Sequence, residues 1–362
     1  MAVRKKTVIE LINQNGIDDV LIPIHPSCDR SAGMKPHIAI ISPALAKANN
    51  GNWQTASRWA RFLAGRYRLT IDTTWNHTHD SAGPDAMIAL HARRSASAVI
   101  EFRAAHPLRP IVLVMTGTDI YRDIHTDTEA QRAMRIATTL VVLQAAALDE
   151  LPTALRGKAR VIHQSAPSLQ PVQRARPRFF DVIQIGHLRA EKDPMSFLRA
   201  ARLVRSPRVR MLHVGGILED AFHDAVRETA DLAPGYRCHG NLPHARTRQL
   251  LKRCALLAIT STMEGGANVI IEAVTSGVPV LASDISGNRG MLGDDYAGYF
   301  PLGDAAALAR LIDRAEADPD FLELLRKQCT ERASLFTPAG EQAALRDLID
   351  NLTIQAEIRA CA

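Results

Sequence analysis

The sequence predicts an α/β protein built from two doubly wound, Rossmann-like domains that face each other across a cleft. The chain has 362 residues, which is enough for two separate hydrophobic cores. Apolar, strand-like segments alternate with helical segments, as in parallel sheets covered by helices on both faces. The alternation stops at residues 167–177, which are rich in proline and charge, and then starts again, as expected at a domain boundary.

Composition narrows the class of protein. Hydrophobic residues make up 46% and charged residues 23%, which is typical of a soluble globular chain. Aromatic residues make up only 5%, too few for stacking on single-stranded nucleic acid. The net charge is +6, but basic and acidic residues are mixed along the chain. We therefore expect a basic cleft for phosphorylated small molecules and no nucleic-acid partner. No apolar run approaches membrane-spanning length, so no membrane association is expected.

The cysteines and the first residues bear on location and domain limits. Five cysteines, an odd number without metal-ligand spacing, suggest reduced thiols in a cytoplasmic protein. Residues 1–33 look unlike the rest and are interpreted as a leader to which no chemistry is assigned. We expect an N-terminal, acceptor-side domain over residues 34–170 and a C-terminal, donor-side domain over residues 171–362. The last helix can cross back to the first domain. The sequence does not fix the oligomeric state.

Each domain is expected to follow the same alternation of strands and helices. Apolar runs predict N-terminal strands at 37–42, 67–72, 86–90, 110–115 and 140–143, with helices at 53–64, 95–106 and 144–155. In the second half, strands are predicted at 182–186, 209–215, 255–260 and 279–283. Helices are predicted after Asp193, which precedes Pro194 as an N-cap, at 219–230, at 269–276, and from Ala305, Asp318 and Ala339.

The most informative motif runs from Met263 to Ala273. It places Glu264 and Glu272 eight positions apart, between a strand and a helix that stops at Gly277. Open α/β sheets bind ligands at such strand–loop–helix corners, where loop amides and a helix N-terminus favour an anion. Glu264 can reach sugar hydroxyls and Glu272 a ribose diol, so the corner suits a nucleotide sugar. The candidate donor-binding residues are Gly265, Gly266, Ala267, Asn268, Val269 and Glu272.

A second motif, residues 186–193, directly follows the first strand of the second half. Arg189 and Lys192 can reach a diphosphate from this loop, Arg through its fork and Lys as a point charge. Cations placed there would stabilise the charge that grows on a departing diphosphate. Arg189, Lys192 and Glu264 are therefore the candidate catalytic residues.

Two loops of the first half are expected to form the acceptor or phosphate side of the cleft. The first joins the first strand to the first helix, where Gly51 permits close approach and Asn52 can cap the helix. The second follows the strand at 110–115. Their candidate residues are Asn50, Gly51, Asn52, Thr55, Thr116, Gly117, Thr118 and Asp119.

Other chemistries find little support in the sequence. His77, His79 and Asp80 have no evident distant third ligand, so no metal site is predicted. His187, His213, His239 and His244 are individually ambiguous. The sequence contains no Gly-x-Ser-x-Gly elbow, no ATPase-type phosphate loop and no DNA-binding motif.

The second half resembles the donor domain of GT-B glycosyltransferases of the glycogen-synthase-like, family-four group. The matching pieces are residues 186–192 and 264–283. The resemblance implies that Arg189 and Lys192 bind the donor diphosphate, that Glu264 contacts the sugar and that Glu272 contacts the ribose. It implies a UDP-sugar co-substrate and no bound cofactor. It also implies no metal, because Arg, Lys and helix amides would stabilise the diphosphate charge in place of a metal ion.

A narrower resemblance involves both halves. Residues 42–56, 116–119 and 264–268 are similar to the selenosugar synthases of selenoneine biosynthesis. This implies transfer of a sugar, N-acetylglucosamine or glucose, from the UDP-sugar to selenophosphate with formation of a carbon–selenium bond. Both partners are small molecules.

The sequence departs from the wider family at two places. Thr116-Gly117 replaces a common His-Gly, and residues 164–167 replace Asn-Gly-Val-Asp. A hydroxyl acceptor needs a positioned base, whereas an anionic selenium does not, and the N-terminal loops offer no convincing base. Three alternatives stay open: a conventional glycosyltransferase with a hydroxyl acceptor, a nucleotide-sugar epimerase on the same fold, and a non-catalytic UDP-sugar sensor.

Overall fold

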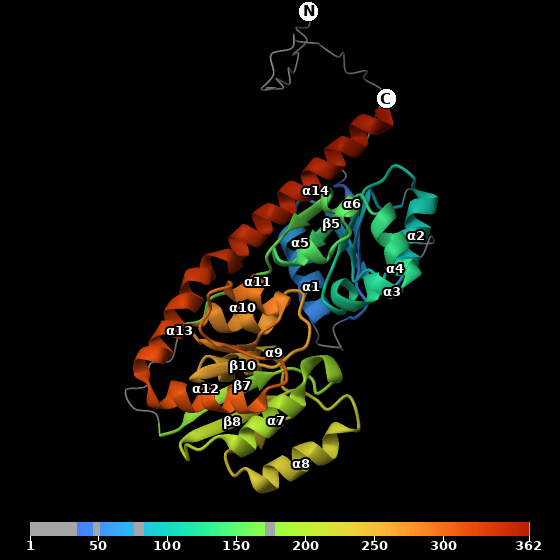
Figure 1. The fold of residues 1–362 in the computed structure, drawn as a ribbon. Helices are drawn as coiled ribbons and strands as arrows, with labels where there is room; N and C mark the ends of the chain where they lie inside the picture. Colours follow the sequence, from blue (N-terminus) through green and yellow to red (C-terminus); the bar gives the residue numbers. More distant parts are fainter. Residues whose placement is uncertain (1–34, 46–50, 76–82, 171–177, 362) are drawn as a thin grey trace, which may run out of the picture.

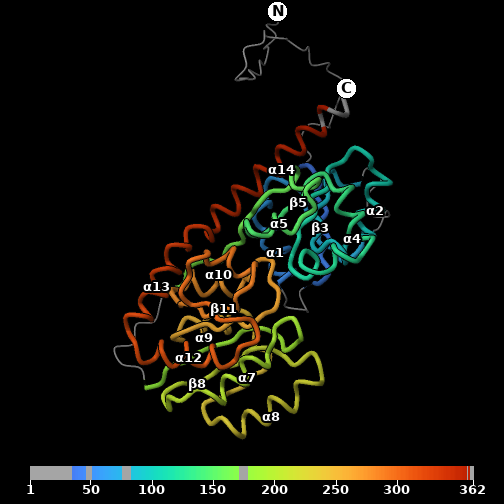
Figure 2. Tube along the Cα trace, in the orientation of Figure 1, coloured from blue at the N-terminus to red at the C-terminus, as the bar shows by residue number. Residues whose placement is uncertain are grey.

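The computed structural model describes residues 35–45, 51–75, 83–170 and 178–361, which form two α/β domains (Figure 1). The candidate Asn50, the leader, the His77–Asp80 segment and part of the linker lie outside these ranges. Figure 2 shows each domain as one continuous stretch of chain, apart from the last helix. The predicted fold class is confirmed.

The N-terminal domain contains a parallel six-stranded sheet in the order β2-β1-β3-β4-β5-β6. Its strands are β1 His37–Ile41, β2 Arg68–Asp72, β3 Ala86–Leu90, β4 Ile111–Val114, β5 Thr139–Val142 and β6 Ala159–Val161. The helices are α1 Gly51–Leu63, α2 Ala96–Ala105, α3 Ile124–Thr126, α4 Thr128–Ile136, α5 Ala147–Glu150 and α6 Thr153–Arg156. A short π-helix covers Asp119–Asp123.

The C-terminal domain repeats this plan in the order β12-β11-β10-β7-β8-β9, again all parallel. Its strands are β7 Phe180–Ile185, β8 Val209–Val214, β9 Tyr236–Cys238, β10 Leu256–Ile259, β11 Val280–Ser283 and β12 Tyr299–Phe300. Its helices are α7 Pro194–Leu203, α8 Phe222–Leu232, α9 His244–Leu251, α10 Asn268–Val274, α11 Ser286–Leu292, α12 Ala305–Ala317 and α13 Pro319–Arg332, with 3-10 turns at Ala190–Lys192 and Ala333–Phe336.

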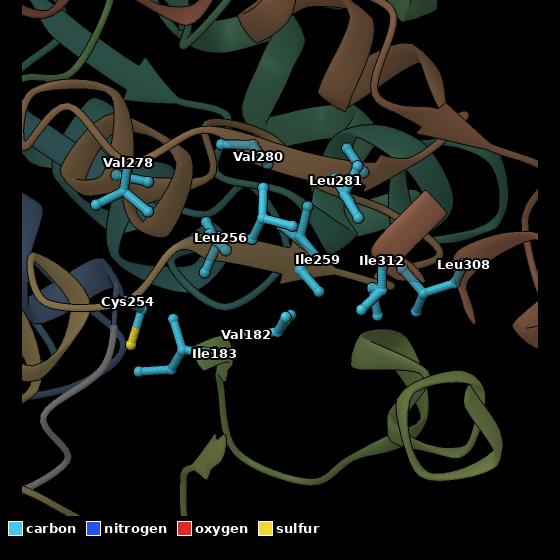
Figure 3. Packing of buried hydrophobic residues seen from close by; sticks show 14 of the residues in the cluster. Val182, Ile183, Cys254, Leu256, Ile259, Val278, Val280, Leu281, Leu308 and Ile312 are labelled. Carbon is cyan, nitrogen blue, oxygen red and sulfur yellow. The ribbon is translucent and has the colours of Figure 1, made fainter. Parts of the chain in front are cut away.

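Apolar side chains on both faces of the central strands explain why each sheet is covered by helices. Every residue of β3, β4, β10 and β11 is buried. Figure 3 shows side chains of β7, β10 and β11 gathered with Leu308 and Ile312 of α12 in the core of the C-terminal domain. Such two-sided burial requires near-continuous apolar strands, which the sequence provides.

Helix α14, Pro338–Cys361, leaves the C-terminal domain and runs along the N-terminal one, as the long red helix in Figure 1 shows. Leu345, Ile349 and Leu352 join the same buried cluster as Trp59 and Leu63 of α1. The Glu341 carboxylate, also buried, accepts hydrogen bonds from Trp59 Nε1 at 2.7 Å and Arg58 Nε at 2.8 Å. The last helix therefore ties the two domains together.

One predicted element is wrong. The single helix expected over residues 144–155 is replaced by the short helices α5 and α6. Leu151 between them is extended, with ψ 140°, because the following Pro152 disfavours helical backbone at the residue before it.

Candidate active site

The candidate donor site lies where the strand order of the C-terminal sheet reverses. β7 and β10 are neighbours, and the chain continues from them to opposite edges of the sheet. The loops after these two strands therefore meet at the carboxyl edge, the usual ligand position in open α/β sheets. These loops carry the residue pair Lys192 and Glu264.

The loop after β7 is anchored from several sides. Asp193 adopts a left-handed conformation, φ 39°, and caps α7 through a bond from Ser196 N at 3.2 Å. Thr260 Oγ1 donates toward the carbonyl oxygens of Lys192 and Asp193, each at 2.8 Å. These contacts fix the backbone from which Lys192 projects.

The Lys192 ammonium pairs with Glu264. Lys192 Nζ lies 2.5 Å from Glu264 Oε1, which also accepts from Ser261 Oγ at 2.6 Å. Both side chains are largely buried, with exposed fractions of 22% and 10%. A lysine ammonium has three donors, so Lys192 can hold Glu264 and still donate to an anion.

Arg189 occupies a more open position than Lys192. Its side chain is 38% exposed, and Nε lies 3.9 Å from Glu191 Oε2. Glu191 also receives Arg122 Nη1 of the N-terminal domain at 3.1 Å. Burial opposes ionisation of Glu191, but hydrogen bonds from its own amide and from Arg122 keep its pKa below the usual value. The ionised Glu191 thus stands between one cation from each domain.

His187, which sequence reasoning left ambiguous, lies in the same loop. Its Nδ1 accepts a hydrogen bond from the Gly216 amide at 3.0 Å. Burial and, secondarily, Arg189 lower the pKa of His187, so its ring is neutral near pH 7. With Nδ1 accepting, the proton lies on Nε2, which is a hydrogen-bond donor.

Glu272 lies toward the C-terminal end of the same motif and is the fifth residue of α10. Its carboxylate is nearly buried, and Oε1 lies 2.6 Å from Nε2 of the half-exposed His244 at the start of α9. His244 thus holds one oxygen of Glu272 and leaves the carboxylate oriented. The sequence does not predict this contact. The two residues are 28 positions apart, and the helix that carries His244 is not among the predicted elements.

The glycines of the motif touch the N-terminal domain. A Cβ placed on Gly265 would lie 2.5 Å from the Thr116 carbonyl, and one on Gly266 would lie 2.6 Å from Leu143 Cβ. Both positions therefore require glycine for close approach between domains. Ala267 then precedes α10 without a side-chain cap, and Val269 lies in the first turn of that helix.

The first loop of the N-terminal domain reaches the donor motif through α1. A Cβ on Gly51 would lie 3.3 Å from Asn268 Nδ2, so the start of α1 adjoins Asn268. Helix α1 begins at Gly51, so the expectation that Asn52 caps it is wrong: Asn52 lies within the first turn. Thr55 is buried, and its Oγ1 lies 2.9 Å from the Gly51 carbonyl oxygen.

The second N-terminal loop is held by Asp119 from within. The Asp119 carboxylate is fully buried and accepts bonds from the amides of Ala92, Thr116 and Gly117 at 2.7 to 3.1 Å. Its oxygens therefore shape the loop, and the loop presents Thr116 and Gly117 to Gly265.

His91 is a residue that sequence reasoning missed. It follows β3 with φ 74°, which is rare for a residue with a side chain. Its ring is buried, with Nε2 3.1 Å from Thr118 Oγ1, and burial lowers its pKa despite nearby Asp119. The sequence signal that could have identified it is its position directly after the apolar run 86–90, at the carboxyl end of the strand beside the β1/β3 switch point.

The structure thus brings Arg189, Lys192, Glu264, Gly265, Gly266, Asn268, Gly51 and Thr116 to the boundary between the domains, while Asp119 lies beneath it. Within the described ranges, no cluster of three or more metal-ligating side chains occurs. Across those ranges no helix is both long and apolar enough to span a membrane.

Comparison with known sequences finds a family model that matches part of the second half of the chain. Residues 168–335 match the model of the family described as "Glycosyl transferases group 1". Over 178 residues the chain is 24% identical to Xenopus tropicalis "Glycosyltransferase 1 domain-containing protein 1", covering 47% of this chain and 50% of that protein. The chain thus spans about half the length of this curated relative.

Solved structures share the two-domain fold. Anabaena HepE, in a complex with UDP and glucose, superposes with a TM-score of 0.70 at 17% identity, covering 87% of this chain and 100% of that one. Sucrose-phosphate synthase from Thermosynechococcus elongatus gives 0.73 at 17% identity, covering 89% and 100%. These likenesses identify the two facing Rossmann-like domains as a GT-B fold.

Proposed function

We propose that this chain is a group 1 glycosyltransferase that takes a sugar from a UDP-sugar and favours selenophosphate as the acceptor. The observation that carries the donor part is the Lys192–Glu264 pair at the β7/β10 switch point, 2.5 Å apart, within the segment that matches the family model. Structures of the same fold contain UDP, with glucose in one case, which supports a nucleotide sugar as donor.

The proposed donor contacts follow from the charges of the site. Lys192 and Arg189 would bind the diphosphate, with backbone amides of residues 266–269 contributing further donors. Glu264 would accept from sugar hydroxyls with its second oxygen, since Oε1 is engaged by Lys192 and Ser261. Glu272 would likewise accept from the ribose diol while His244 holds its Oε1.

The proposed transfer breaks the bond between the anomeric carbon and the diphosphate oxygen. UDP departs with that electron pair, and the acceptor supplies the pair for the new bond. Negative charge on the diphosphate increases along this path, so Lys192 and Arg189 bind the transition state more tightly than the ground state. This tighter binding of the transition state is the main catalytic contribution that we propose for the two cations.

The acceptor side supports an acceptor that arrives ionised. Asp119 is occupied by three backbone amides, and the buried Asp123 is paired with Arg93 at 2.9 Å and Arg122 at 3.1 Å. These partners engage the oxygens of both carboxylates, so neither is proposed as a general base. The ionised selenium of selenophosphate attacks without losing a proton, and so needs no such base.

His91 favours a second candidate function, transfer to a hydroxyl acceptor. Its Nδ1 accepts the Arg94 amide at 3.4 Å, so Nε2 carries the proton and donates to Thr118 Oγ1 at 3.1 Å, an indirect route by which His91 would orient an acceptor hydroxyl. His91 itself is almost wholly buried, so this route depends on the Thr118 hydroxyl.

Mass spectrometry of reaction mixtures tests the proposal. UDP-glucose and UDP-N-acetylglucosamine are each incubated with selenophosphate, thiophosphate or hydroxyl acceptors, and without acceptor. We expect release of UDP and a product in which the sugar is joined to selenium. This product is the selenophosphate adduct of the sugar or, after hydrolysis of its P–Se bond, the free selenosugar. A product only with hydroxyl acceptors would establish the second candidate. An altered UDP-sugar without acceptor would indicate an epimerase, and donor binding without UDP release would indicate a sensor.

A further inference from the structure

Gln164 lies where three parts of the chain meet between the domains. It follows β6 at the start of the segment that leads into the C-terminal domain, and it is 1% exposed. In the amide orientation that satisfies its neighbours, the side-chain nitrogen donates to Gly266 O at 3.1 Å and Asn268 Oδ1 at 3.3 Å. The side-chain oxygen accepts from Thr55 Oγ1 and from Arg58 Nη2, the latter at 3.3 Å. One amide thus joins α1 to the donor motif.

The α1 side of this contact is itself fixed. Arg58 Nε donates to the buried Glu341 of α14 at 2.8 Å, and Ser165 Oγ donates to the same carboxylate at 2.5 Å. The two chain crossings between the domains also meet here, because the Ala166 amide donates to the Phe336 carbonyl at 3.4 Å. The partners of Gln164 on α1 are therefore linked both to the segment that joins the domains and to α14.

The donor side of the contact consists mainly of backbone. Residues 264–267 form a loop containing two glycines, and Gly266 approaches Leu143 and Gln164 so closely that a Cβ would collide. From the donor motif, the Gly266 carbonyl and the Asn268 side chain contact Gln164. A glycine loop acquires a defined position only through such external contacts.

We propose that Gln164 is a positioning residue for the transfer step, which sets the donor motif at residues 266–268 against the start of α1. The inference rests on the proposed function and adds to it the residue that aligns donor and acceptor. Reaction geometry is sensitive to displacements of about 1 Å, which can reduce turnover about 100-fold. UDP affinity should depend less on Gln164 than kcat does, because the proposed UDP contacts Arg189, Lys192 and Glu272 are held within the C-terminal domain and only the amides of residues 266–268 depend on this contact.

Two substitutions separate the halves of this contact. Gln164→Glu keeps an oxygen that can accept from Thr55 and Arg58 but loses the nitrogen that donates to Gly266 and Asn268. Gln164→Met has a similar length and loses both halves. As a matched control, Gln328→Met removes a glutamine that binds Ala297 N at 3.0 Å and Asp295 O at 2.9 Å, within the C-terminal domain alone.

The experiment measures UDP affinity by calorimetry, kcat and KM for transfer, and the ratio of donor hydrolysis to transfer in the full chain. For both Gln164 variants we expect UDP affinity within about threefold of the parent, kcat lower by about 10- to 100-fold, and a larger share of hydrolysis. Gln328→Met should match the parent in all three.

Two results would overturn the inference: parental kcat and hydrolysis ratio in both Gln164 variants, or loss of UDP binding together with activity, which would mark Gln164 as structural only. The proposed function fails differently, through absence of UDP binding or of transfer in the parent chain itself.

Discussion

Lys192 and Glu264, 72 residues apart in the sequence, form an ion pair of 2.5 Å across the β7/β10 switch point. The pair is largely shielded from water, so neither charge is free to leave without leaving the other uncompensated. A diphosphate bound at this point would meet a cation that is already held in place by its carboxylate partner. Preorganisation of this kind is what stabilises developing charge in a transition state.

The first prediction concerns the two cations. Lys192→Ala should lower kcat by about 100- to 1,000-fold, the usual loss for a removed transition-state donor. Arg189→Ala should have a smaller effect, because its more exposed guanidinium already lies near Glu191. Steady-state kinetics with the preferred UDP-sugar measures both. Arg199→Ala, on the exposed side of α7, serves as a control for loss of a positive charge. Parental activity in the Lys192→Ala, Arg189→Ala double variant would disprove the diphosphate assignment.

The second prediction concerns the Glu272–His244 pair. Glu272→Ala should weaken UDP binding about 10- to 100-fold, as expected for loss of hydrogen bonds to a charged acceptor. His244→Ala should weaken it less, since it only frees the carboxylate from a contact of 2.6 Å. Calorimetric titration with UDP distinguishes the two. Equal affinity for UDP in the parent and in Glu272→Ala would contradict the ribose role.

The third prediction concerns the glycines at the domain boundary. Gly265→Ala would place a Cβ 2.5 Å from the Thr116 carbonyl, a backbone atom that cannot move aside without shifting the domains. We expect kcat to fall at least about 10-fold with little change in thermal stability. Gly157→Ala, where a Cβ meets nothing within 4 Å, is the control. Turnover of Gly265→Ala equal to that of Gly157→Ala would show that the approach of the domains is not needed.

The fourth prediction concerns pH and the buried His213. Burial lowers its pKa to about 4, so protonation favours the unfolded chain, where the pKa is about 6.5. Its contribution to stability is complete above about pH 6.5 and is lost as the pH falls toward 4. Between pH 7 and pH 5 this amounts to about 2 kcal/mol of unfolding free energy. Denaturant titrations of the parent and of His213→Gln should differ in pH dependence by about that amount, and parallel curves would refute the assignment.

Elements with strong local signals were predictable from the sequence. Asp193 followed by Pro194 specifies the start of α7, and the apolar run 86–90 coincides with β3. The short edge strands β6, β9 and β12 were not predicted, because two or three residues carry too little periodicity. Their positions come from pairing with longer neighbours, which is a tertiary property.

The sequence predicts candidate site residues within single loops and does not predict contacts between distant segments. The motif around Glu264 is predicted from the spacing of its carboxylates, and the loop of Lys192 from its position directly after a strand. The pairing of Glu272 with His244, the bridging position of Gln164 and the constrained His91 depend on contacts between segments that are far apart in the sequence. Asp119 is expected among the residues of the acceptor side. Its carboxylate instead binds backbone amides and supports the loop from below.

A crystal structure of the chain with UDP tests the central proposal most directly. We predict that the diphosphate lies against Lys192 and the amides of residues 266–269, and that the ribose contacts Glu272. UDP bound at any other place, or the absence of measurable UDP binding, would contradict it.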